Sequence, residues 1–459
     1  MALTESESSS HARRSSLAGA SDLLRRWLAD SSDRSLAQKI AGGAFLIRVA
    51  SAALIYLSQI FLARWMGSFE FGIYVYVWTL VLMVGDLADL GLATAAQRFI
   101  PQYTARNAGD LLRGYISRSR WLALASATAI AAIGVLAVQV FETSLPDYLV
   151  LPLSIAWVTL PFYALMQMQD GIARSYNWIH VALLPPYIVR HVLMLVLIAA
   201  AYFLSFPTSA ETAVMAVGIA LVLTVAGQTL VLNRKLRDVV PPGPKATEPR
   251  VWLAASLPIL MVEGFYVLLT NTDIIVLQQF GTPDDVAIYY AAAKTLALIA
   301  FVHFAVSAAV AHRFSEYHAN GDRAALNAIL SDSIRWTFWA SLAACTIILL
   351  LGQPLLWLFG KQFVGGYHLM LILAVGLMAR AALGPVERLL NMVGEQRICA
   401  FVYATAFLLN LVLCVALIPR MGVTGAAIST ATSLMVESIL LFQVTKRRLG
   451  LHVFIWGRR

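Results

Sequence analysis

The sequence is poor in charged residues, and this scarcity excludes an ordinary soluble domain. Only 13% of its 459 residues are Asp, Glu, Lys or Arg, whereas 59% are hydrophobic. A soluble domain usually carries about a quarter charged residues. The apolar residues gather into long runs separated by short polar segments, so the composition indicates an all-α, polytopic membrane protein.

Cysteine is also scarce, and its placement excludes a disulfide framework. The three cysteines, Cys345, Cys399 and Cys414, all fall within apolar runs. Cys399 and Cys414 lie on one predicted helix, about 22 Å apart at 1.5 Å per residue, which is too far for a disulfide bond. We therefore expect buried thiols with a structural role.

The common catalytic signatures are missing from the sequence. It contains no P-loop, no GxSxG, no HExxH and no Asp-x-Asp. The lack of a P-loop argues against intrinsic ATP hydrolysis, and no metal-ligand spacing is found. We expect that the protein is not an enzyme and that it holds no cofactor or metal.

Hydropathy predicts twelve membrane spans of about 17–28 residues each. They cover residues 42–64, 71–95, 120–141, 149–170, 183–205, 211–232, 252–279, 286–311, 336–352, 367–389, 398–418 and 422–444. Every second connection is rich in Lys and Arg, and the alternate ones (GSFEF, ETSLPDY, SFPTSAE, GTPDD and PRMG) are nearly free of them. The positive-inside rule then places both termini in the cytoplasm. The net charge of +9 follows from this topology and from anionic lipid, and no motif indicates a nucleic-acid partner.

The two halves of the chain repeat each other. Residues Tyr74, Arg98, Phe99, Arg120 and Trp121 recur 215 positions later as Tyr289, Arg313, Phe314, Arg335 and Trp336. Six spans per half give parallel repeats about an axis along the membrane normal. We expect two pseudo-symmetric six-helix lobes around a central cavity, which suits alternating access.

These patterns divide the chain into four predicted parts. They are a polar cytoplasmic tail (1–40), an N-terminal lobe (41–240), a C-terminal lobe (241–445) and a basic cytoplasmic tail (446–459). The first tail lacks the apolar core of a signal peptide, so the first span is expected to act as signal and anchor. Within the first tail, residues 22–39 suit either an amphipathic surface helix or a disordered segment.

Several stretches resemble the polysaccharide-biosynthesis flippases, which belong to the superfamily of oligosaccharide flippases and multidrug extruders. They are ARWMGSFEFGIYVYVWTLVLMVGDLADLGLATAAQRF, NTDIIVLQQFGTPDDVAIYYAAAKTL and GVTGAAIST. The similarity runs from about residue 40 to residue 445. It implies a flippase that moves a polyprenyl-pyrophosphate-linked oligosaccharide across the bacterial inner membrane for exopolysaccharide, capsule or O-antigen synthesis. Its implied partners are this lipid-linked oligosaccharide, membrane lipids and a polysaccharide polymerase or export machinery.

Two other functions are weighed against this one. A cation-coupled extruder of small molecules or drugs would use the same fold, with an acidic or aromatic cavity in place of a cationic one. A membrane-embedded sugar polymerase or ligase would need a large outer platform. The longest predicted outer loop, near 352–366, is short, which disfavours such an enzyme.

Charged residues within spans are the candidate site residues, because each costs about 2.5–3.5 kcal/mol at a helix centre. We expect Arg48, Arg190, Lys294 and Arg380 to contact an anionic headgroup. Arg98 and Arg313, the repeated pair, are candidates for a cytoplasmic entrance. Snorkelling, salt bridges and positive-inside anchoring are the structural alternatives. Arg380 lies mid-span without an obvious acidic partner nearby in the sequence, so we expect it to serve transport rather than folding.

Four acidic residues in the spans are candidates for ion coupling or a gate: Asp86, Asp89, Glu263 and Asp273. The spacing in GDLADLG predicts that Asp86 and Asp89 share one helix face in the cytoplasmic third of their span. There they would pack against basic groups at the inner mouth, and a proton site is the alternative. Glu263 follows Pro258 by five residues, where a bent helix suits a carboxylate that carries a proton or binds Na⁺.

Overall fold

The computed structural model describes residues 33–455, and its regular structure there is entirely helical. Most of the predicted polar tail, including residues 22–32 of the suggested surface helix, lies outside the described residues. Contacts divide the chain into a short unit that ends at Ala50 and a large unit that begins at Ser51. Each unit is described by itself.

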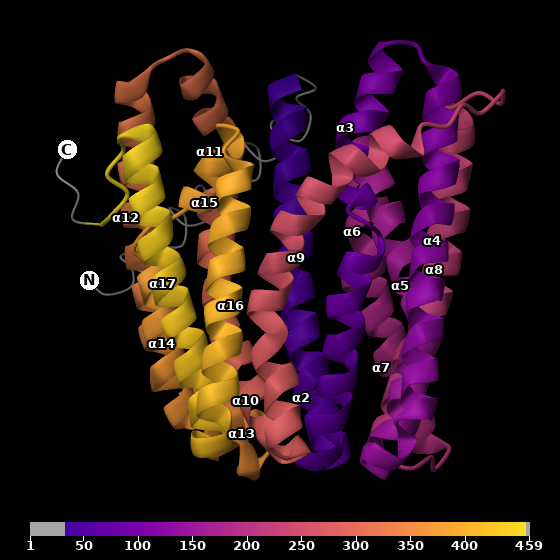
Figure 1. Ribbon diagram of the computed structural model, residues 1–459, viewed down its shortest axis with the longest axis vertical. Coiled ribbons are helices and arrows are strands. Elements are labelled where there is room, and N and C mark those ends of the chain that lie inside the picture. Colours follow the sequence, from indigo (N-terminus) through magenta and orange to yellow (C-terminus); the bar gives the residue numbers. More distant parts are fainter. Residues whose placement is uncertain (1–32, 456–459) are drawn as a thin grey trace, which may run out of the picture. The chain divides into compact units, whose positions relative to one another are not determined.

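The helices follow one another with short connections (Figure 1). The first half contains α2 (Asp33–Ala88), α3 (Leu92–Ala105), α4 (Gly109–Val140), η1 (Glu142–Ser144), α5 (Asp147–Ser175), α6 (Ile179–Leu184), η2 (Pro185–Val189), α7 (Arg190–Phe203) and α8 (Ala210–Val239). The second half contains α9 (Pro249–Phe280), α10 (Pro283–Leu296), η3 (Ala297–Ile299), α11 (Ala300–Ala319), α12 (Arg323–Leu350), α13 (Gly352–Phe359), η4 (Lys361–Gly366), α14 (Tyr367–Ala381), α15 (Val386–Met392), α16 (Gln396–Met421) and α17 (Val423–Leu449).

Eleven helical segments of the described chain are long and apolar enough to cross a membrane. The first of them, Ile47–Ala105, has 59 residues. As one straight helix it would measure about 88 Å at 1.5 Å per residue, far more than a hydrocarbon core of about 30 Å. It is interrupted at Gly67, where φ is 81° and ψ is 174°. The all-α membrane fold is therefore confirmed, whereas the number of twelve spans stays a prediction.

Within the large unit, most helices pack against helices of their own half. In the first half α5 packs against both α4 and α8, and in the second half α17 packs against α14 and α16 (Figure 1). Helix α9 joins the two sets, because it begins against α3 and runs along α16. Its Trp252 is fully buried and donates from Nε1 to the Tyr103 hydroxyl at 2.9 Å. The lobe boundaries expected from the sequence stay a prediction.

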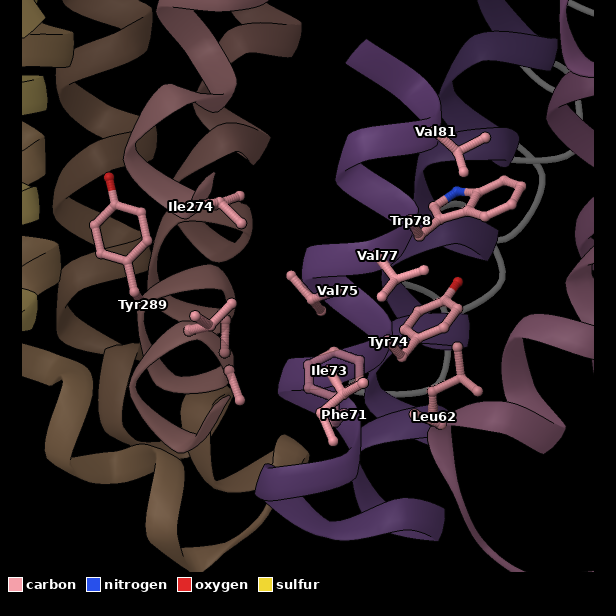
Figure 2. Packing of buried hydrophobic residues seen from close by; sticks show 14 of the residues in the cluster. Leu62, Phe71, Ile73, Tyr74, Val75, Val77, Trp78, Val81, Ile274 and Tyr289 are labelled. Carbon is pink, nitrogen blue, oxygen red and sulfur yellow. The ribbon is translucent and has the colours of Figure 1, made fainter. Parts of the chain in front are cut away.

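One cluster of buried apolar side chains spans both halves. Figure 2 shows Phe71 and Val75 of α2 on one side and Ile274 and Tyr289 of α9 and α10 on the other. The backbones approach closely here, since a Cβ on Gly72 would lie 1.8 Å from the carbonyl oxygen of Pro283. Any side chain larger than hydrogen would push α2 away from α10, so the glycine is required by packing.

The repeated residues occupy similar environments in the two halves. Phe99 is 4% exposed and its counterpart Phe314 is fully buried. Trp121 is 63% exposed and its counterpart Trp336 is 72% exposed. Both tryptophans follow a repeated arginine on α4 and α12, so burial agrees with the duplication read from the sequence.

The chain beyond α17 folds back onto the second half. Leu451, Val453 and Ile455 are buried in a second apolar cluster, together with Leu326 and Leu330 of α12. Along this segment buried residues alternate with exposed ones, namely His452 and Phe454. The expectation of buried thiols is confirmed, because Cys345, Cys399 and Cys414 are all buried and none forms a disulfide bond.

Candidate functional site

The GDLADLG stretch marks the end of one helix and the start of the next. Helix α2 ends at Ala88, Leu90 and Gly91 have φ of 59° and 70°, and α3 begins at Leu92. The Asp89 carboxylate accepts hydrogen bonds from the amides of Gly91 at 2.8 Å and Ala93 at 3.3 Å. It thus satisfies amide donors that the first turn of α3 leaves without helical partners. The prediction that Asp86 and Asp89 share one helix face is therefore wrong, because α2 ends at Ala88, before Asp89.

Asp86 contacts neutral donors on α5. Its Oδ1 accepts from the Tyr163 hydroxyl at 2.9 Å and from Gln167 Nε2 at 3.1 Å. Neither Asp86 nor Asp89 takes part in an ion pair within the described residues. The expected packing of this acidic pair against basic groups at an inner mouth stays a prediction.

Arg190 lies close to Asp86. The two charges interact, and the guanidinium also sits over the Trp78 ring at 5.6 Å from the ring centre. Its Nη1 is buried and donates to no acceptor in the part of the chain that the structure describes. Two predicted site residues, Arg190 and Asp86, therefore come together in the first half.

A cavity in the second half brings together three more predicted residues. It has a volume of about 330 Å³, and Asp273, Lys294 and Arg380 all line it. The remaining lining comes from α9, α10, α14 and α17, with Tyr266 and Tyr290 supplying aromatic surface. Cations, one carboxylate and aromatic rings thus share one space.

Asp273 is held rigidly at the wall of this cavity. Only 4% exposed, it accepts hydrogen bonds from the Tyr289 hydroxyl, from Thr430 Oγ1 at 3.0 Å and from the Ile274 amide at 2.9 Å. Tyr289 and Thr430 were not identified as site residues from the sequence. The repeat had singled out Tyr289, and GVTGAAIST contains Thr430, but neither pattern indicates that they contact Asp273.

Lys294 and Arg380 differ in how their charges are compensated. The Lys294 side chain is exposed to the cavity, with its ammonium 5.1 Å from the centre of the Tyr290 ring. It forms no ion pair with a described carboxylate. Arg380 instead pairs with Glu387 at 3.3 Å and with Glu437 at 3.7 Å. The structure thus gives Arg380 the acidic partners that its sequence neighbourhood did not reveal.

The position of Arg380 also differs from the expected one. It lies in the last turn of α14, because the helix ends at Ala381 and α15 begins only at Val386. Gly384 between them has a φ of 61°. The predicted span 367–389 is therefore broken beside the cavity, and the break lets the guanidinium reach Glu387 on α15.

Glu263, Arg98 and Arg313 are not among the residues that line this cavity. Glu263 is exposed and accepts from Thr94 Oγ1 of α3 at 3.0 and 3.2 Å. Arg98 and Arg313 are exposed on α3 and α11. Arg48 belongs to the short unit that ends at Ala50, so it is not placed relative to the cavity. The described residues contain no group of three or more His, Cys, Asp or Glu side chains that could hold a metal ion.

Sequence comparisons connect the chain to known membrane proteins. Residues 41–318 match the family described as polysaccharide biosynthesis protein, and residues 258–416 match the MatE family. A curated relative from Haloferax volcanii, named "probable low-salt glycan biosynthesis flippase Agl15", is 22% identical over 398 residues. The match covers 86% of this chain and 80% of the relative.

Solved structures share the fold. A multidrug resistance MATE family transporter of the MOP superfamily, in an inward-facing conformation, superposes with a TM-score of 0.71 at 16% identity, covering 88% of this chain and 98% of that one. The lipid II flippase MurJ, in an inward closed conformation, gives 0.69 at 14% identity, with 87% of each chain covered. A MOP superfamily transporter from Pyrococcus furiosus gives 0.67 at 15% identity, covering 90% and 95%. The fold is therefore that of MOP superfamily transporters.

Proposed function

Because the chain belongs to the polysaccharide biosynthesis protein family, we propose that it flips a polyprenyl-pyrophosphate-linked oligosaccharide across the membrane by alternating access. The proposed setting is the bacterial inner membrane, with both termini cytoplasmic, and the proposed role is synthesis of a surface polysaccharide. The name of the Haloferax volcanii relative, a probable glycan biosynthesis flippase, supports this proposal. A polymerase or export machinery would act on the flipped product.

The observation that carries the proposal is the lysine in the second-half cavity. Lys294 is exposed there and forms no ion pair with the carboxylates of the described residues. A cation within a membrane span is costly and marks a functional site by default. A pyrophosphate is a concentrated anion, and an ammonium group binds phosphate as a point charge. Lys294 is therefore the proposed first contact for the headgroup.

The other candidate residues support this contact in different ways. Arg380 is already compensated by two carboxylates, so its proposed role is to shape the cavity wall beside the headgroup. Arg190 is the proposed counterpart in the first half, and Arg48, Arg98 and Arg313 remain proposed headgroup or entrance contacts. Asp273 is the proposed coupling residue, because it lies beside Lys294 and their charges interact.

A second candidate function has an observation of its own. The same cavity contains Asp273 and the rings of Tyr266, Tyr289 and Tyr290, which suit a cationic aromatic molecule. Its lining residues on α9, α10 and α14 also fall within the region that matches the MatE family, residues 258–416. A cation-coupled extruder of small molecules would use Asp273, rather than Lys294, as the main contact.

The test is a flipping assay in vesicles that contain the purified protein. A fluorescent undecaprenyl-pyrophosphate oligosaccharide is incorporated, and its access to a glycan-cleaving enzyme added outside is followed with time. We expect protein-dependent crossing in the wild type and a loss of roughly tenfold or more in Lys294→Gln, since charge-assisted hydrogen bonds are the strong ones. The matched control is Lys361→Gln, which removes the same charge from an exposed residue of η4.

The outcome decides between the two candidates. Crossing that is lost in Lys294→Gln and retained in Lys361→Gln supports the flippase. Absence of crossing with several glycans, under both proton and sodium gradients, contradicts it. Efflux of a cationic dye that fails in Asp273→Asn and survives in Lys294→Gln would then favour the extruder.

A further inference from the structure

A second cavity, in the first half, is strongly basic. It has a volume of about 470 Å³ and lies between α4, α5, α8 and the connection to α9. Four cations line it, namely Arg113, Arg120, Arg237 and Lys245. No Asp or Glu is among its described lining residues. It shares no described lining residue with the cavity that contains Lys294.

Hydrogen bonds hold the connection between α8 and α9 against α4. Arg113 of α4 donates from Nε to the carbonyl of Pro244 at 2.8 Å and from Nη1 to that of Pro241 at 3.2 Å. The Ala246 amide donates to the Asp110 carbonyl at 3.1 Å. A Cβ on Gly114 would lie 1.6 Å from the Ala246 carbonyl oxygen. The connection therefore contacts α4 closely at Gly114, and its Lys245 lines the cavity.

Arg120 has two buried nitrogens, Nε and Nη2, that meet no acceptor in the described part of the chain. Its Nη1 donates to Asn233 Oδ1 at 2.8 Å. Buried charges in proteins are normally paired, because an unpaired one loses its hydration without compensation. An anion placed in this cavity would accept from both nitrogens in the forked geometry that guanidinium groups offer to phosphates.

The residues around this cavity suit access from the membrane surface. Trp121, also in its lining, is 63% exposed, and tryptophan is typical of the membrane–water interface. The surrounding connections are the basic ones, which the positive-inside rule places against the anionic cytoplasmic leaflet. Basic pockets between helices on that side suit phospholipid headgroups.

We propose that this cavity binds the phosphate of an anionic lipid headgroup, with Arg120 as its main ligand and Lys245 closing over it from the connection. Lys245 donates to Ser117 Oγ at 3.2 Å, which holds its ammonium at the rim. The shared chemistry is a phosphate anion, and a soluble phosphate is the other source. This site is separate from the cavity that contains Lys294. The proposal for it does not depend on the proposed function.

The proposal is tested with the full-length protein, purified in detergent and stripped of native lipid. Native mass spectrometry measures how many lipid molecules stay bound to the protein after phosphatidylglycerol is added. A parallel sample receives phosphatidylcholine instead. We expect at least one tightly held phosphatidylglycerol and no comparable phosphatidylcholine. Arg120→Gln weakens this binding by roughly tenfold or more. To test for a soluble phosphate, pyrophosphate is added without lipid, and the shift in the unfolding temperature of the protein is measured.

Two controls keep the result specific. Arg118→Gln makes the same change two residues away, at an exposed position outside the cavity lining, and should bind as the wild type does. Lys294→Gln should also retain binding, because it alters only the other cavity. If Arg120→Gln does not fold, Lys245→Gln replaces it, because that residue lies outside any helix.

The outcomes separate the sources. Loss of phosphatidylglycerol in Arg120→Gln or Lys245→Gln, but not in Arg118→Gln, supports a lipid site. A shift in unfolding temperature with pyrophosphate, lost in the same variants and without lipid retention, supports a soluble phosphate. Equal retention in all variants with no effect of pyrophosphate overturns the proposal.

Discussion

At the scale of single residues, Arg380 and Glu437 form an ion pair whose burial bears on stability. Glu437 is fully buried on α17, and its Oε1 lies 3.7 Å from Arg380 Nε. Neither carboxylate oxygen of Glu437 accepts a hydrogen bond from a described residue. The guanidinium is therefore the group that compensates this buried charge. A role in transport alone, as the sequence suggested, does not account for this contact.

We expect Arg380→Ala to lower the free energy of unfolding by about 3–5 kcal/mol, because it leaves Glu437 as an uncompensated buried charge. The measurement is the unfolding temperature of the purified variant in detergent. Arg380→Ala combined with Glu437→Gln should recover more than half of the loss, since the remaining side chain is neutral. Wild-type stability in the single variant would show that the pair contributes little.

The candidate site illustrates what the sequence could predict at this scale. Lys294, Arg380 and Asp273 stand out because charges are costly in apolar spans, and no structure is needed to notice them. Their partners were not predictable in the same way. Glu437 lies 57 residues beyond Arg380 on another helix, and only packing of α14 against α17 brings the two together.

At the scale of elements, the break between α2 and α3 gives Asp89 a structural role. Its carboxylate caps α3, and Gly91 adopts a left-handed φ of 70°. A Cβ on Gly91 would also lie 2.7 Å from the Ser256 carbonyl oxygen of α9. The break therefore sets how closely α3 approaches α9.

We expect Asp89→Ala to destabilise the protein by about 1–2 kcal/mol, the cost of removing a helix cap. Asp89→Asn should keep most of the stability, because its amide oxygen can still accept from the two amides. The two variants are compared by unfolding temperature and by flipping in vesicles. Full stability but complete loss of flipping in Asp89→Asn would instead indicate that Asp89 carries a proton.

The helices themselves were predictable, but their interruptions were not. Long apolar runs with polar ends indicate membrane helices by composition alone. The residues directly around Leu90 are mostly apolar on both sides, in VLMVGDLAD and GLATAA, so the local sequence reads as one continuous apolar run across the break. The signal was the Asp-x-Gly of residues 89–91, since aspartate caps helices and glycine allows a left-handed turn.

At the scale of the whole molecule, the large unit has contacts between its halves where α10 begins. Ser68 donates to Asp284, and Arg64 donates to the carbonyls of Trp357 and Leu358 at 2.8 and 2.6 Å. Phe71 packs edge-on against Phe363 at 6.1 Å. Alternating access requires that contacts on each side of the membrane separate in turn. In the proposed alternating-access cycle, these contacts are the ones that would have to break for the substrate to pass this end.

We expect cross-linking of Ser68→Cys to Asp284→Cys with a short thiol-specific reagent to abolish flipping, and reduction to restore it. The native Cys345, Cys399 and Cys414 are at most 4% exposed, so the reagent should leave them unmodified. Each single-cysteine variant serves as a control and should flip normally after the same treatment. Undiminished flipping in the cross-linked protein would show that this end stays closed throughout transport.

The segment that folds back after α17 and the connection between α8 and α9 have no counterparts in the repeat that the sequence predicts. In the second half, Leu451, Val453 and Ile455 fill the space beside α12 with apolar side chains. In the first half, the connection leaves a space lined by four cations. In the duplication that the sequence predicts, these two segments are therefore places where the halves differ without any change in a paired helix.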